Sequence, residues 1–235
     1  MTPVIRISEE IFTRLQGLAE PLVDTPASVI QRLLDQHDGK ADDTRSRTGR
    51  ERVVLPEFQA DKWEGACNSL YLAPGSTQNI QKTIAGSVAL DQIQAQLTPL
   101  QYISLKQALA GSLTLKCFAV KERSRNDFES MVSGDIVLFA EKGAGRFGFV
   151  GRVLTKLESE NLGGLLWSDP DWRFIYILDR TWRANIDKKK TLLALGYDEG
   201  FWLPRFMRVK HDVLVSIKKR FGSLADFLGT LQKPS

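Results

Sequence analysis

Apolar positions in the first 37 residues follow two different periodicities. Ile5 and Ile7 alternate with their neighbours, the period-2 pattern that predicts a short strand. Over residues 11–22, and again over residues 29–34, apolar side chains recur at helical spacing, which predicts two helices. A strand and two helices of this size bury too little surface to fold alone. We therefore expect residues 1–37 to form a homo-oligomer by pairing with a second copy across a two-fold axis.

The rest of the chain reads as a linker followed by one larger domain. Residues 38–52 carry almost no apolar side chain but four arginines, which predicts a basic linker. From residue 53 to 235, short apolar runs bounded by turn residues predict strands, and helical spacing predicts helices between and after them. Short strands without a long helix indicate an α+β fold built on a small closed barrel. The predicted strands are 115–121, 135–142, 147–157 and 172–182; the predicted helical stretches are 84–109 (interrupted at Thr98-Pro99), 126–132, 158–167 and a pair about Gly222.

The N-terminal pattern resembles a known family of dimeric DNA-binding segments. The run IRISEEIFTRL, followed by DTPASVIQRLLD, is similar to the N-terminal oligomerisation segment of the replication-sequestration protein SeqA and related ribbon-helix-helix proteins. In many such proteins the outward strand residues read the major groove, and here these are Thr2, Val4 and Arg6. One arginine is a thin reading surface, so the resemblance favours oligomerisation over base reading for residues 1–37.

Three strand motifs in the larger domain resemble the PUA-like superfamily, in particular its EVE and YTH-like branches. They are Phe118-Ala-Val-Lys121, the run GDIVLF that begins at Gly134, and the run FVGRV that begins at Phe149. The later run LLWSDPDWRFIYILD is similar to the continuation of such domains in bacterial modification-dependent restriction systems. The resemblance spans roughly residues 60–225. It implies a PUA-like mixed β-barrel with flanking helices that recognises modified DNA by flipping a base into an aromatic pocket, in a restriction or phage-defence context.

Base flipping needs flat apolar walls, groups that pair with the base edge, and cations for the distorted backbone. The candidate walls are Trp172 and Trp182, with Trp167 and Trp202 in nearby connections. A tryptophan is more often a core or rim residue than a pocket wall, so each has an alternative structural interpretation. The candidates for pairing with the base edge lie on the loop after the first barrel strand: Lys121, Arg123 and Asn126.

The charge distribution supports a nucleic-acid partner. The net charge is only +4, but basic residues cluster at residues 45–52 and 205–220. Such clusters contact phosphates in DNA-binding proteins, although a solvated surface gives the same pattern. Double-stranded DNA is thus the expected partner, together with a subunit of a restriction system. The expected backbone contacts are Arg6, Arg45, Arg47, Arg125, Lys218, Lys219 and Arg220.

Candidate catalytic and metal-binding residues are few. Two histidines and two cysteines cannot form the usual zinc sites, and no nucleotide-binding loop is present, so we expect neither metal nor cofactor. A PD…DxK nuclease pattern could use Asp171, Asp187 and Lys189 with a divalent metal. The chain contains two acid-x-Lys tripeptides, about the number that its composition yields by chance. The leading interpretation is therefore a binding protein rather than an enzyme.

Three alternatives remain open from the sequence: a modification-dependent nuclease, a ribbon-helix-helix transcriptional regulator, and an RNA-binding PUA-like protein. No run approaches the roughly 20 apolar residues of a membrane span, and the first residues lack the pattern of a secretory signal. These features, with the sparse cysteines, predict a cytoplasmic protein.

Overall fold

The computed structural model describes Ser8, residues 55–60 and residues 69–232. The chain divides into a unit of residues 1–52 and a unit of residues 53–235. The predicted ribbon-helix-helix segment and the basic linker lie outside the described residues, Ser8 apart. All described helices and strands belong to the second unit.

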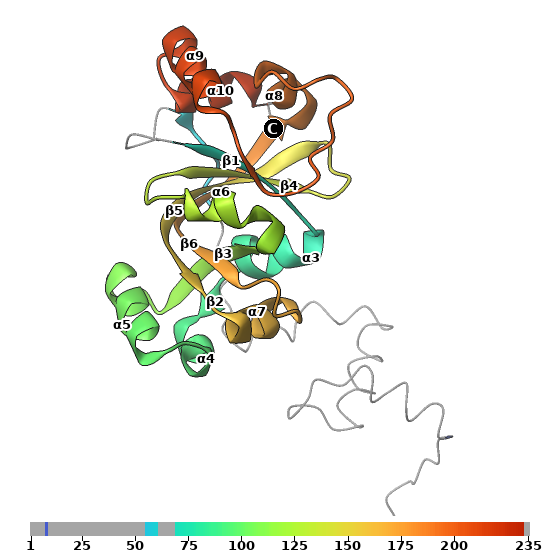
Figure 1. The fold of residues 1–235 in the computed structure, drawn as a ribbon. Coiled ribbons are helices and arrows are strands. Elements are labelled where there is room, and N and C mark those ends of the chain that lie inside the picture. The colour runs from blue at the N-terminus through green and yellow to red at the C-terminus, as the bar shows by residue number, and fades with distance from the viewer. Residues whose placement is uncertain (1–7, 9–54, 61–68, 233–235) are drawn as a thin grey trace, which may run out of the picture. The chain divides into compact units, whose positions relative to one another are not determined.

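One mixed seven-stranded sheet forms the centre of this unit (Figure 1). The strand order is β2-β3-β6-β5-β4-β1-β7. β1 runs parallel to β4, and the other neighbouring strands pair antiparallel. The order confirms an α+β fold with a mixed sheet. The strands are β1 (Leu70–Gly75), β2 (Val88–Ala89), β3 (Thr114–Val120), β4 (Ile136–Glu141), β5 (Arg146–Glu158), β6 (Phe174–Asp187) and β7 (Met207–Arg208).

The two longest strands, β5 and β6, pair along almost their whole length, and their register shifts at three points. Such irregularities bend a strand and increase its twist. β6 therefore pairs with β3 through its first half only, while its second half continues along β5. The sequence pattern located β6 but ended it at residue 182, whereas the strand continues to Asp187, which caps the next helix by accepting a hydrogen bond from the backbone of Lys190 at 2.9 Å.

The apolar runs of the central strands are buried on both faces, which is why they lack polar alternation. On β6, Tyr176 faces an inner core and Ile177 an outer one. The inner core lies inside the curved sheet and is rich in aromatic rings, among them Phe118, Phe139, Phe174, Tyr176 and Phe206. One outer core lies beneath α4, α5 and α7, and a second packs against α8, α9 and α10 at the other end of the sheet (Figure 1).

Short helices connect and cover the strands. The pair α9 and α10 meets at Gly222, as the sequence predicts, and Gly222 has a φ of 85°. Thr98 caps α5 through a reciprocal capping box with Gln101, followed by Pro99 in the first turn. The elements are α3 (Thr77–Ile80), η3 (Gln81–Ala85), α4 (Leu90–Ile93), η4 (Gln94–Gln96), α5 (Pro99–Ala108), η5 (Glu122–Ser124), α6 (Arg125–Glu129), α7 (Glu160–Trp167), α8 (Lys188–Ala194), α9 (His211–Phe221) and α10 (Leu224–Leu231).

The predicted helical stretch 84–109 was wrong in its first part. The chain leaves η3 after Ala85 and forms β2 before the next helix begins. The Lys116 ammonium group ends η3 by donating hydrogen bonds to the carbonyls of Ile84 at 2.7 Å, Ala85 at 3.2 Å and Gly86 at 2.6 Å. Because this lysine comes from β3, a local pattern of apolar residues cannot reveal the break.

The Gly134-Asp135 pair of the second strand motif has a structural role. Gly134 has a φ of 88°, which a residue with a side chain rarely adopts. The fully buried Asp135 carboxylate accepts hydrogen bonds from the backbone of Ser69 at 3.0 Å and Val132 at 2.9 Å. Desolvation raises the pKa of Asp135, and these two bonds oppose that rise. The motif thereby ties the start of β1 to the start of β4.

Candidate nucleic-acid interface

A small cavity lies between β1 and β3, two strands that share no ladder among the described pairs. Ala73 and Pro74 of β1 form one side, and Phe118 to Val120 of β3 form the other. Its volume is about 40 Å³, enough for a few water molecules. The remaining lining residues are Lys121, Arg123, Ser124, Trp172, Arg205 and Phe206.

The two strands approach closely because β1 ends in glycine. A Cβ at Gly75 would lie 2.9 Å from Cζ of Phe118 and 3.0 Å from the side chain of Ile80. Such contacts are too short for a real side chain. Gly75 therefore permits the Phe118 ring to occupy the space between β1 and β3.

Aromatic rings surround Phe118. Their ring centroids lie 5.5 Å from it for Phe139, 6.3 Å for Trp167, 6.4 Å for Trp172 and 6.3 Å for Tyr176. Three of these four contacts are edge-on, the arrangement that aromatic quadrupoles favour. The cluster combines Trp167, which ends α7, and Trp172, from the α7–β6 connection, with rings from three strands. A planar ligand that entered here would meet flat apolar surfaces.

The tryptophans are held in place by the packing of α7. Ser159 caps this helix by accepting from the backbone of Leu162 at 3.2 Å, and Lys82 donates to the Leu166 carbonyl at 2.7 Å near its end. A Cβ at Gly163 would lie 2.6 Å from the carbonyl oxygen of Trp172. The helix therefore packs directly on the backbone of the turn that presents Trp172.

Two buried polar atoms of this cluster have no hydrogen-bond partner. They are the indole nitrogen of Trp167 and the hydroxyl of Tyr176, and no other fully buried side-chain nitrogen or oxygen in the described residues lacks one. An unpaired buried polar group costs about 1–3 kcal/mol. Burial also raises the pKa of Tyr176 well above its ordinary value, so the phenol stays protonated and able to donate.

Lys121 places a positive charge at the cavity. Its ammonium group lies 5.3 Å from the centroid of the Trp172 ring and 2.6 Å from a carboxylate oxygen of Asp169. The hydrogen bond from Lys121 lowers the pKa of Asp169. Beside it, the Arg205 guanidinium donates to the backbone carbonyl of Arg123. The Arg123 side chain is exposed and forms no ion pair with a described residue.

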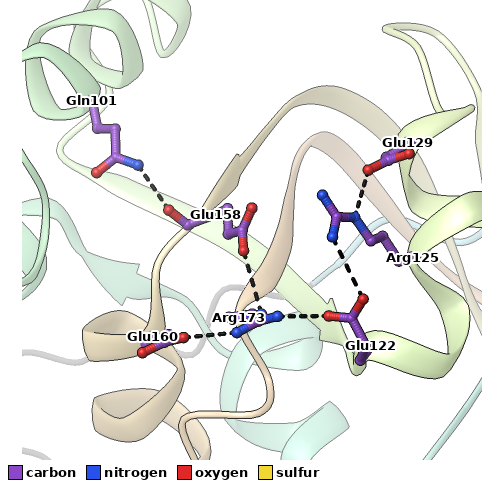
Figure 2. Close-up of polar contacts among 7 residues, drawn as sticks. All are labelled: Gln101, Glu122, Arg125, Glu129, Glu158, Glu160 and Arg173. Carbon is purple, nitrogen blue, oxygen red and sulfur yellow. Dashed lines mark hydrogen bonds and ion pairs between the residues drawn. The ribbon is translucent and has the colours of Figure 1, made fainter.

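Arginines and glutamates form a network beside this site (Figure 2). Arg173 contacts Glu122 at 2.6 Å and Glu160 at 2.7 Å. Arg125 contacts Glu129 at 2.6 Å and Glu122 at 3.6 Å. Hydrogen bonds from the arginines lower the pKa of Glu122, mainly through Arg173. Arg125, expected on the DNA backbone, thus already has two carboxylate partners.

The structure brings together three of the five expected pocket residues, namely Lys121, Arg123 and Trp172. Asn126 is exposed on α6 and does not line the cavity. Trp182 packs against Phe58, with ring centroids 6.1 Å apart, beside the core under the C-terminal helices. Of the two tryptophans expected in nearby connections, Trp167 contacts Phe118 and Trp202 is 72% exposed.

The expected backbone contacts are scattered. Lys218, Lys219 and Arg220 are exposed in the last turn of α9, at the end of the sheet opposite α7 (Figure 1). At the C-terminal end of a helix these positive charges interact favourably with the helix dipole and are solvated, so their position has a structural explanation as well. The three arginines at positions 6, 45 and 47 lie outside the described residues.

The nuclease pattern does not assemble into a site. Asp171 precedes β6 and Asp187 is its last residue, so thirteen strand residues lie between them, about 40 Å of contour. Asp171 lies 4.0 Å from Lys121, while Lys189 pairs with Glu199. These acids cannot hold one metal ion in this arrangement. Across the described part of the chain, no group of three or more histidine, cysteine or acidic residues is placed to bind a metal.

The sequence reasoning missed Phe206 and the role of Phe118 as the centre of the cluster. Phe206 stacks on Tyr71 at 5.3 Å and lies 5.6 Å from Tyr176, although it comes from a loop near the C-terminus. Phe118 is in the first strand motif, but no pattern shows that Gly75 lies against it. Among the described helices, none is long and apolar enough to cross a membrane.

Comparisons with known proteins identify a relative in fold. No family model matches the chain, and no curated protein matches it. The N-terminal domain of Thermococcus gammatolerans McrB, solved bound to m5C DNA, aligns with 66% of this chain and 98% of its own length. The TM-score is 0.50 and the sequence identity 16%. The likeness is one of fold: about two thirds of this chain share the fold of that McrB domain.

Proposed function

We propose that this protein binds double-stranded DNA that carries a modified base. The base would be flipped out of the duplex into the cavity between β1 and β3. The observation that carries the proposal is the aromatic cluster beside Lys121 and Arg123, on a fold shared with a domain solved on methylated DNA.

The cluster offers the chemistry that base recognition requires. Trp172 and Trp167 provide flat surfaces for stacking, which contributes about 1–3 kcal/mol per base. Lys121 adds a cation over the Trp172 ring, and Arg123 places an exposed guanidinium at the mouth, where it can contact a phosphate of the distorted backbone. Because the aromatic surfaces are apolar, an added methyl group on the base gains contacts there.

A proposal about the cellular context accompanies the proposed binding. We propose that the chain reads modified DNA for a restriction or phage-defence system, in which a partner subunit performs cleavage. The PD…DxK acids are too far apart to supply that activity here. We assign the chain a binding role, with the nuclease role left to a partner.

We also propose that residues 1–37 assemble the chain into an oligomer. The two apolar stripes that their sequence predicts would need a partner surface. An oligomer would also place several reading domains on one duplex, which raises affinity without new contacts. Light scattering of the full chain should report an oligomer. A chain that starts at Val53 should be a monomer, and an unchanged mass would contradict the assignment.

A binding panel tests the proposed function. Fluorescence anisotropy would compare one duplex sequence with cytosine or adenine unmodified, methylated, hydroxymethylated or glucosylated, at fixed salt because phosphate contacts make affinity salt-dependent. We expect at least one modified duplex to bind about tenfold or more tightly than the unmodified one, within the range of one stacked base. Equal affinity for all duplexes, or stronger binding to structured RNA, would contradict the proposal.

A further inference from the structure

The cavity between β1 and β3 is too small for the ligand of the proposed function. At about 40 Å³ it holds a few waters, whereas pockets for drug-sized ligands are about 300–1,000 Å³. A base can enter only if a lining side chain moves. The question is which one can leave without unfolding the domain.

Two other rings line the cavity, those of Phe206 and Trp172. Phe206 lies between Tyr71 and Tyr176, and the Tyr71 contact is a parallel stack with an interplanar angle of 10°. The backbone of Trp172 is held by the close approach of Gly163. Phe118 is itself buried among four rings, but it lies on a strand edge without a described partner. On one side β3 pairs with β6, and on the other side its described partner β2 pairs only with Thr114 and Leu115. Beyond Leu115 that edge of β3 borders the cavity.

The unpaired polar atoms point to the same ring. Trp167 and Tyr176 each have their ring centroid 6.3 Å from that of Phe118. Their indole N–H and phenol O–H are fully buried and unpartnered. Native proteins satisfy nearly all buried polar groups, so two exceptions around one phenylalanine require a physical reason. A benzene ring offers neither group a conventional hydrogen bond, whereas a nucleobase of similar shape does.

We propose that the Phe118 ring occupies the seat of the flipped base and swings out when the base enters. The Trp167 indole N–H and the Tyr176 hydroxyl then pair with the base edge. This inference rests on the proposed function and adds the residues that set specificity. The indole only donates, so the base must present an acceptor, such as N3 or O2 of cytosine or N1 of adenine; the hydroxyl can donate or accept.

A state in which the Phe118 ring fills the seat of the base lowers the apparent affinity for DNA. When only a fraction of molecules have the seat vacated, the apparent affinity is reduced by that fraction. A smaller side chain at position 118 should raise the vacated fraction and tighten binding. Removal of the Tyr176 hydroxyl should have opposite effects on stability and on binding, because the free protein loses an unsatisfied group while the complex loses a hydrogen bond.

The test compares three variants of the full chain with the wild type. The variants are Tyr176→Phe, Phe118→Leu and the control Phe227→Leu, which removes a fully buried ring from the core under the C-terminal helices. The probes are duplexes with and without one 5-methylcytosine or N6-methyladenine, and the free methylated nucleosides. Thermal melting reports stability, anisotropy reports duplex binding, and tryptophan fluorescence reports nucleoside binding.

We expect Tyr176→Phe to melt no lower than the wild type and to bind the preferred modified duplex about tenfold more weakly, as loss of one hydrogen bond predicts. Phe118→Leu should bind that duplex several-fold more tightly. Phe227→Leu should melt lower and bind as the wild type does. A Tyr176→Phe variant that melts lower with unchanged binding, or a Phe118→Leu variant that loses the preference, would overturn the inference.

Failure of the proposed function gives a different result. If the wild type does not distinguish the duplexes, the proposed function is wrong, and the nucleosides alone decide the inference about the seat. Tighter binding of a methylated nucleoside to Phe118→Leu than to the wild type and to Phe227→Leu would support it. No difference among the three would overturn it. If Phe118→Leu does not fold, Phe118→Met, which keeps most of the volume but is flexible, replaces it in the same comparison.

Discussion

Replacement of Trp172 by alanine should remove the preference for modified DNA and leave general DNA binding intact. The ring is half-buried, lies 6.4 Å from the Phe118 centroid and has the Lys121 ammonium 5.3 Å from its own centroid. Loss of one stacking surface costs about 1–3 kcal/mol, a factor of about five to a hundred in affinity. The cation–π contact with Lys121 is already present in the free protein, so its loss lowers stability by about 0.5–1 kcal/mol and does not add to the loss of affinity. Lys121 keeps its ion pair with Asp169, so the charge at the mouth is preserved.

The matched control is Trp182→Ala. Trp182 is also a half-buried tryptophan of the same domain, but it packs against Phe58 beside a different core. Anisotropy titrations of both variants, with a modified and an unmodified duplex, give the ratio of dissociation constants for each. We expect Trp172→Ala to bring this ratio close to one and Trp182→Ala to leave it unchanged at some cost in stability. A Trp172→Ala variant that keeps the wild-type ratio and remains folded by circular dichroism would refute the reasoning.

Three further predictions follow from other parts of the domain. Glutamate in place of Lys218, Lys219 and Arg220, which lie in the last turn of α9, should weaken binding of modified and unmodified duplexes equally, since phosphate contacts carry no sequence information. It should also reduce the salt dependence of the affinity, and a change in the preference for modified DNA would contradict this prediction. Gly163→Ala should lower the melting temperature and the preference together, because its Cβ would meet the Trp172 backbone at 2.6 Å; an unchanged melting temperature would count against that close packing. Burial raises the pKa of the Cys117 thiol from 9.0 to about 12. As pH rises above about 9 the thiol therefore ionises in the unfolded state before it does in the folded state, and the free energy of unfolding falls. Cys117→Ala should lack this loss, and iodoacetamide should label Cys117 at pH 8.5 only after unfolding; prompt labelling of the folded protein would contradict the burial.

The sequence identified elements whose cause is local. The Thr98-Pro99 break is confirmed because the capping box is formed by residues three apart. The four central strands are found within a few residues because their apolar runs are continuous, apart from the far end of β6. The helical stretch at 84–109 failed in its first part because the group that ends η3 is Lys116, on a strand that comes later in the chain.

The candidate site was only partly accessible to the same reasoning. Lys121 and Trp172 could be named because Lys121 ends a strand motif and Trp172 follows a Ser-Asp-Pro-Asp turn. The cavity itself depends on the approach of Gly75 to Phe118, between two strands that share no ladder, and on Phe206 from a late loop. No periodicity encodes such contacts. Trp182 illustrates the converse, since it lies on β6, ten residues after Trp172, yet packs beside a different core.

The measurement that tests the central claim most directly is base flipping itself. A fluorescent 2-aminopurine placed next to the modified base is quenched by stacking in the duplex, and it brightens when its neighbour leaves the stack. We predict that saturating protein raises this fluorescence several-fold on the modified duplex and leaves the matched unmodified duplex dark. Equal fluorescence of the two saturated duplexes would contradict the account.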